Sequence, residues 1–226
     1  MKGIIEISPH IYQIGGNGQS DGDDCCISLV EGDQASALVD AGAGRSVDRL
    51  MRNMEQGGLD PRAIKYIIVT HGHIDHIGGL KELKKRLGAQ VIAHEMELPA
   101  IQDGLPQLTA AAWYGVEYQK VKVDCVLKGD QASISLGNLN LICLHTPGHT
   151  PGGIAVYVDS PGGRVLFGQD IHGPFKQEWG SDLKKWRLSM AKLIALQADI
   201  LCEGHFGIYR PAVKVRQYIE NYLERY

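Results

Sequence analysis

Residues 70–79, which read Thr-His-Gly-His-Ile-Asp-His-Ile-Gly-Gly, concentrate imidazole and carboxylate side chains in one short segment. Within six residues it carries His71, His73, Asp75 and His76. Burying so many polar side chains is costly unless each of them finds a partner, and a cation can pair with all of them at once. The segment therefore predicts a metal site.

Three further segments each place one histidine or aspartate among glycines, directly after an apolar run. They are 146–153, 167–170 and 202–207. Their side chains of interest are His149, Asp170 and His205. Glycine permits the sharp turns and close backbone approach that a converging site needs. Together with the first segment, they give seven nitrogen and oxygen ligands, a donor set that suits zinc and does not exclude iron or manganese.

The elements that must position these residues follow from hydrophobic periodicity and turn residues. The predicted strands are 4–7, 11–14, 26–30, 35–40, 64–70, 90–93, 121–127, 132–136, 139–145, 154–158, 164–168 and 200–202. The predicted helices are 46–56, with Ser46 as its N-cap, 80–87, 183–196 and about 212–226. Residues 101–119 show no clean period. Two β-rich halves, each ending in strand and helix, indicate an α/β sandwich built as one domain, 1–226; a doubly wound parallel sheet is the alternative.

Composition narrows the function classes. The chain has 226 residues and a formal net charge of -3, which gives no reason to expect nucleic acid or an anionic membrane as a partner. The first ten residues are too polar for a signal peptide, and no apolar run approaches the roughly 18 residues of a membrane span. We therefore expect a cytoplasmic protein. The five cysteines are expected to be reduced and core-filling, with a redox-active Cys25–Cys26 pair as the alternative.

The pattern HxHxDH, followed by a distant His, Asp and His, resembles the metallo-β-lactamase superfamily over residues 4–208. The resemblance implies a four-layer αββα sandwich with the site along one edge of the two sheets. It also implies two divalent metal ions, with zinc expected. One would be bound by His71, His73 and His149, and the other by Asp75, His76 and His205. Asp170 would bridge them.

Such a site implies hydrolysis. Two cations roughly 3.5–4 Å apart lower the pKa of a shared water, and the bridging hydroxide attacks a carbonyl or phosphoryl centre. Asp75 is expected to orient this nucleophile and shuttle its proton, besides binding metal. Asp40 matches an early strand-end aspartate of the superfamily and would orient a metal-binding histidine; the alternative is an ordinary turn aspartate. His172 either lines the pocket or is a solvated loop histidine.

Among hydrolases, β-lactamases of this superfamily lack the bridging aspartate and are exported. Glyoxalase II looks closer, but this sequence has Gly72 where that enzyme usually has a histidine, and only about twenty residues follow His205. We therefore expect a small ester, thioester or lactone substrate without a glutathione-binding domain. The alternatives are a mononuclear iron persulfide dioxygenase using His71, His149 and Asp170, a phosphodiesterase, and a non-catalytic metal-binding domain.

Trp113 and Tyr114 lie in the irregular stretch and are candidates for binding an apolar substrate group. The alternative is that both fill the core beneath a long loop. The expected partner is a small-molecule substrate, and we expect neither nucleic acid nor a membrane as a partner. The sequence is compatible with a monomer or a homodimer.

Overall fold

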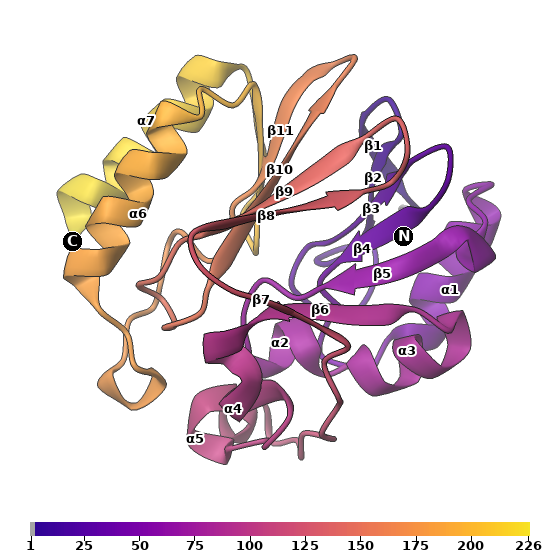
Figure 1. The fold of residues 1–226 in the computed structure, drawn as a ribbon, viewed down its shortest axis with the longest axis horizontal. Coiled ribbons are helices and arrows are strands. Elements are labelled where there is room, and N and C mark those ends of the chain that lie inside the picture. Colours follow the sequence, from indigo (N-terminus) through magenta and orange to yellow (C-terminus); the bar gives the residue numbers. More distant parts are fainter. Residues whose placement is uncertain (1–2) are drawn as a thin grey trace.

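Two β-sheets pack face to face in the computed structural model, which describes residues 3–226, and helices cover the outer side of each sheet (Figure 1). The predicted four-layer αββα sandwich is confirmed. The alternative of one doubly wound parallel sheet is wrong, because the strands divide into two sheets that are rich in antiparallel pairs. Of the predicted domain 1–226, residues 1 and 2 lie outside the described part.

The first sheet takes its seven strands from the first half of the chain, in sequence order. They are β1 (Ile5–Ser8), β2 (Ile11–Gly15), β3 (Ile27–Glu31), β4 (Ser36–Val39), β5 (Ile64–Ile68), β6 (Gln90–His94) and β7 (Cys125–Leu127). The pairs from β1 to β4 are antiparallel and those from β4 to β7 are parallel.

The second sheet takes its six strands from the second half, in the order β13-β12-β11-β10-β9-β8. They are β8 (Gln131–Ser135), β9 (Asn140–His145), β10 (Ile154–Ser160), β11 (Gly163–Phe167), β12 (Ile200–Glu203) and β13 (Gly207–Tyr209). Only β11 and β12 pair in parallel, with α6 in the connection between them.

Helices of very different length cover the two sheets. On the first sheet lie α1 (Val47–Gln56), α2 (Ile74–Ile77), α3 (Leu80–Leu87), α4 (Leu98–Ile101) and α5 (Pro106–Thr109). On the second lie α6 (Leu183–Ala195) and α7 (Ala212–Arg225). The 3₁₀ turns are η1 (Pro61–Ala63), η2 (Glu95–Glu97), η3 (Ala111–Tyr114) and η4 (Gln177–Trp179). No helix among residues 3–226 is long and apolar enough to cross a bilayer.

Three apolar clusters hold the four layers together. One lies between the first sheet and its helices, and includes Leu50, Ile67 and Leu83. A second fills the space between the sheets, with Ile11, Val156 and Phe167. The third joins the second sheet to α6 and α7. Burial on both sides explains why the second part of each of β5 and β11 is continuously apolar, whereas the exposed Lys65 and the partly exposed Arg164 lie near the starts of these strands.

The structure corrects several local predictions. Ser46 precedes α1 but does not cap it, because its hydroxyl donates to the buried carboxylate of Asp24. The predicted strand 121–127 shortens to β7, and β13 was not predicted. The aperiodic stretch 101–119 contains single helical turns, α5 and η3, which are too short to show a period.

The five cysteines are free thiols, and all but Cys125 are buried. Burial raises the pKa of Cys26 to about 12, and it raises that of Cys25 as well. A thiol with a raised pKa forms little thiolate near neutral pH, which argues against the redox-active pair.

We predict that Ile11→Ala lowers the free energy of unfolding by about 2–5 kcal/mol, because it opens a cavity between the sheets. The Ile11 side chain is fully buried in the cluster between the sheets. Leu188→Ala is the control: its side chain is 68% exposed, so we expect a change within about 0.5 kcal/mol. Denaturant unfolding of both variants measures the difference, and equal effects would contradict this account of the core.

Candidate metal centre

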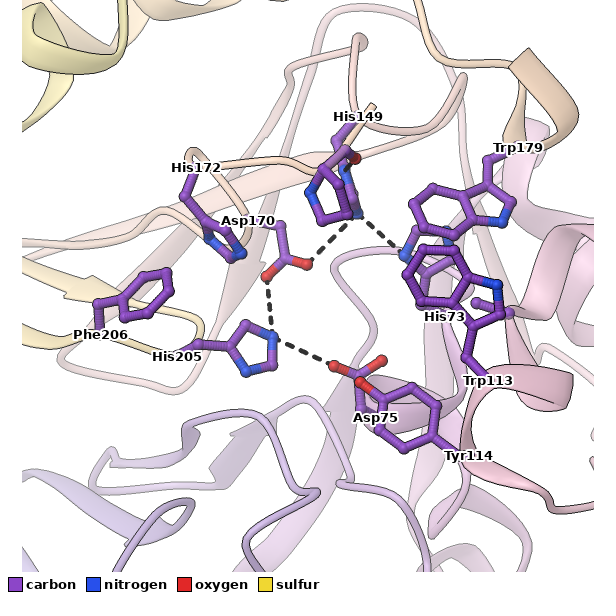
Figure 2. A pocket seen from close by; sticks show the side chains of 12 residues that line it. His73, Asp75, Trp113, Tyr114, His149, Asp170, His172, Trp179, His205 and Phe206 are labelled. Carbon is purple, nitrogen blue, oxygen red and sulfur yellow. Dashed lines mark hydrogen bonds and ion pairs between the residues drawn. The ribbon is translucent and has the colours of Figure 1, made fainter. Parts of the chain in front are cut away.

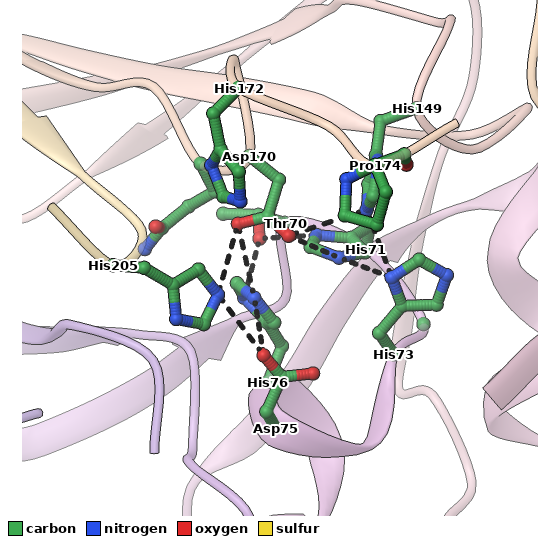
Figure 3. A network of polar contacts seen from close by, with 12 residues as sticks. Thr70, His71, His73, Asp75, His76, His149, Asp170, His172, Pro174 and His205 are labelled. Carbon is green, nitrogen blue, oxygen red and sulfur yellow. Dashed lines mark hydrogen bonds and ion pairs between the residues drawn. The ribbon is translucent and has the colours of Figure 1, made fainter. Parts of the chain in front are cut away.

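The side chains predicted to bind metal come together at one edge of the two sheets, where loops from both sheets meet (Figure 3). The segment after β5, including α2, supplies four of them, and the loops after β9, β11 and β12 supply one each. In chain order they are His71, His73, Asp75, His76, His149, Asp170 and His205. All four segments begin at the carboxyl end of a strand, which is why residues distant in sequence converge.

The first group of ligand atoms belongs to His71, His73 and His149, which we call the first histidine group. Nδ1 of His73 lies 3.0 Å from Nε2 of His71 and 2.9 Å from Nε2 of His149. Oδ2 of Asp170 lies 3.3 Å from Nε2 of His149 and 3.6 Å from Nε2 of His71. These four atoms lie within 4.8 Å of one another, as donors around a single ion would.

The second group consists of Asp75, His76 and His205. Oδ2 of Asp75 lies 3.5 Å from Nε2 of His76 and 3.1 Å from Nε2 of His205. The other oxygen of Asp170, Oδ1, lies 3.5 Å from Nε2 of His76 and 3.4 Å from Nε2 of His205. The carboxylate of Asp170 therefore turns one oxygen towards each group.

Hydrogen bonds on the side of the rings that faces away from the centre fix the tautomers of two imidazoles. Nδ1 of His76 donates to Oδ2 of Asp40 at 2.8 Å, and Nδ1 of His149 donates to the Pro174 carbonyl at 2.9 Å. In both rings this leaves the Nε2 atom facing the centre without a proton when the ring is neutral, as metal binding requires. Asp40 also accepts from the hydroxyl of Thr70 at 2.7 Å.

The donor set fits divalent cations. Among the described residues, Nε2 of His76 and Oδ1 of Asp170 are buried without a hydrogen-bond partner. A buried polar atom left unpaired costs about 1–3 kcal/mol, and a cation between the rings and the carboxylates would satisfy both atoms. Imidazole nitrogens and carboxylate oxygens suit zinc, iron and manganese.

The two groups differ in charge. Burial, followed by the neighbouring histidines, holds the pKa of both His71 and His73 well below the usual value, so these rings are neutral. Burial would also lower the pKa of His205, but the Asp170 and Asp75 carboxylates outweigh it and raise that pKa to about 10. Burial would lower the pKa of His76 as well, but nearby negative charge, including the carboxylates of Asp40, Asp75 and Asp170, outweighs burial and raises that pKa. Without a cation, the second group therefore holds protons at neutral pH.

Two buried carboxylates beside the ligands were not predicted. Glu97 accepts from the backbone N–H of Gly72 and of Gly152. Glu203 accepts from the backbone N–H of His205 at 2.8 Å and from Nδ1 of His172, also at 2.8 Å. In sequence both look like ordinary surface acids, and only the apolar run before Glu203 hints that its side chain is buried.

An open cavity of about 280 Å³ lies in front of the ligands (Figure 2). Trp113, Tyr114 and His172 all line it. Trp113 is 54% exposed, which excludes the alternative that it fills the core. Trp179 and Phe206 also line the cavity and were not predicted. The ring centroids of Trp179 and His73 are 4.4 Å apart.

We predict that the two groups differ in how their metal affinity depends on pH. Below the raised pKa of His205 a cation must displace a proton, so affinity at the second group should fall at least about tenfold per pH unit lowered. The first group, in which the rings of His71 and His73 are neutral, should lose less affinity between pH 8 and 6 than the second group. Zinc titrations with a competing chelator at both pH values measure this, and His205→Ala, which removes one of the two imidazoles with a raised pKa, should weaken the pH dependence. Equal losses for both equivalents would contradict the charge assignment.

Comparisons with known proteins agree with this geometry. The family model described as the metallo-beta-lactamase superfamily matches residues 21–205. Probable metallo-hydrolase YqgX of Bacillus subtilis is 31% identical over 144 residues, 62% of this chain and 64% of that protein. Hydroxyacylglutathione hydrolase GloC of Haemophilus influenzae is 27% identical over 141 residues, 57% of this chain and 58% of that protein. The match thus spans less than two thirds of each of these relatives.

Among solved structures, a mutant metallo-beta-lactamase from Cronobacter sakazakii superposes with a TM-score of 0.84 at 23% identity, covering 100% of this chain and 95% of that one. At this identity the likeness shows the fold alone. The family match over residues 21–205 goes further: the chain belongs to the metallo-beta-lactamase superfamily.

Proposed function

We propose that the protein is a hydrolase that holds two divalent cations, with zinc the expected metal, and cleaves an ester, thioester or lactone bond in a small molecule. The observation that carries the proposal is the orientation of Asp170. Its two oxygens face two separate ligand groups, beside a cavity open to solvent. A purely structural metal site has its ligand positions closed and needs no such cavity.

The bound cations would supply a water of lowered pKa and stabilise negative charge on a carbonyl oxygen. The side chains of the chain do the remaining work. Asp75 lines the cavity, and its carboxylate would accept the proton that the attacking water releases (Figure 2). Tyr114 lies beside Asp75, and burial together with that carboxylate raises the pKa of its hydroxyl. Tyr114 therefore stays protonated and can donate a hydrogen bond to substrate.

The cavity walls support a small substrate with an apolar group. The cavity has a volume of about 280 Å³, which suits a short acyl chain or a small ring. Trp113 and Trp179 form an aromatic wall, with their ring centroids 4.9 Å apart. His172 would contact the substrate from the opposite side. The relative named hydroxyacylglutathione hydrolase favours a thioester among the candidate bonds.

We expect Asp170→Asn to lower kcat/KM more than about a hundredfold, since even residues behind metal ligands affect activity or affinity by 10–100-fold. The control is Asp130→Asn, whose side chain is 86% exposed and which should behave like the wild type. Both would be assayed against a panel of ester, thioester, lactone and phosphodiester substrates, with metal content measured. Turnover of phosphodiesters alone would favour the phosphodiesterase, and metal binding without any turnover would favour a non-catalytic domain.

We predict that Trp113→Ala and Tyr114→Phe raise KM or change substrate preference while metal content stays at the wild-type level. Tyr118→Phe is the matched control, because the Tyr118 hydroxyl donates to the Ile101 carbonyl at 3.1 Å and its ring packs on the core. That variant should lose stability and keep its KM. If the Trp113 and Tyr114 variants lose stability and keep the wild-type KM, the substrate binds elsewhere.

A further inference from the structure

Glu97 is a buried carboxylate with an unusual set of partners. Its side chain, at the end of η2, is 3% exposed. Oε2 accepts from the backbone N–H of Gly72 at 2.7 Å, and Oε1 accepts from the backbone N–H of Gly152 at 2.8 Å. Among residues 3–226, no lysine or arginine pairs with Glu97, and burial raises the pKa of its carboxyl group. A buried charge is expensive, so its retention here needs a reason.

The two partners of Glu97 belong to the two segments that carry the first histidine group. Gly72 lies between His71 and His73, and Gly152 lies in the loop of His149. One side chain therefore ties together a loop of the first sheet and a loop of the second. The hydrogen bonds are short and charge-assisted, which makes them stronger than neutral ones.

Both glycines are required for this approach. A Cβ atom at residue 72 would lie 2.8 Å from Oε2 of Glu97, and one at residue 152 would lie 2.9 Å from Oε1. Real Cβ atoms essentially never come this close to another heavy atom. At residue 72 an added Cβ atom would also lie 2.4 Å from Cβ of Ala100, so glycine is the residue that fits between His71 and His73 here.

We propose that Glu97 is a positioning residue for the first metal: it holds the loops of His71, His73 and His149 at a fixed spacing. The inference rests on the proposed function, because it assumes that the first histidine group binds a cation. Glu97 acts through the backbone, whereas Asp40 acts directly on an imidazole of the second group.

The test measures metal affinity at one group at a time. In a His205→Ala background the second group is incomplete, so zinc competition with a chromophoric chelator reports the first group. Adding Glu97→Gln keeps the shape but removes the charge and turns an amide N–H₂ towards a backbone donor. We expect the affinity to fall about 10–100-fold. Glu95→Gln, an exposed change two residues away, is the matched control and should alter affinity less than about twofold.

A second background separates positioning from general loss of structure. In His149→Ala, only the second group remains intact, and there Glu97→Gln should change affinity less than about threefold. Cobalt bound to the first group should also show a shifted visible absorption spectrum in Glu97→Gln, because the imidazole geometry relaxes. If Glu97→Gln fails to fold, Glu97→Asp keeps the charge but is one methylene too short to reach both loops, and should weaken the first group alone.

Equal affinities for the Glu97→Gln and Glu95→Gln variants, or equal losses at both groups, would overturn the inference. If one of these results is obtained and the wild type still binds metal and hydrolyses substrate, the inference about Glu97 is wrong but the proposed function stands. If the wild type takes up no metal, the proposed function and the inference fall together.

Discussion

The rest of the site depends on the carboxylate of Asp170, which faces both groups of ligand atoms. It is buried, with one oxygen towards the first histidine group and the other towards Asp75, His76 and His205. So many imidazoles and carboxylates in one buried place stay together only if opposite charge lies between them. Protons supply part of that charge at the second group. At the first group the rings of His71 and His73 are neutral, and under the proposed function a cation would supply the positive charge there.

The fold brings the charged and polar side chains of the site together at one edge of the two sheets. Strands of two sheets end at the same edge, so short loops from distant parts of the chain meet there. Loops alone are mobile, and buried carboxylates restrain them from behind: Asp40 through a ring nitrogen, and Glu97 and Glu203 through backbone N–H groups. The site is thus built in two layers, ligands in front and acceptors behind.

Much of this could be predicted from the sequence, for physical reasons. Strands buried on both faces have continuous apolar runs, and the ligand-bearing turns are rich in histidine and glycine, so the layers and the converging segments were visible. Glu97 was not, because a buried acid held by backbone N–H groups has no pattern of its own. Trp179 and Phe206 were missed for a similar reason, since a single aromatic residue in a loop looks the same whether it faces a cavity or solvent. Ser46 seemed a helix cap because the buried Asp24 that takes its hydroxyl is distant in sequence.

We propose that the carboxylate of Asp170 bridges two cations. X-ray diffraction at the zinc absorption edge, from crystals of protein purified without added metal and then supplied with zinc, tests it most directly. We expect two anomalous peaks about 3.5–4 Å apart, each contacted by a different oxygen of Asp170. A single peak between His71, His149 and Asp170, with the Asp75, His76 and His205 group unoccupied at saturating zinc, would contradict it.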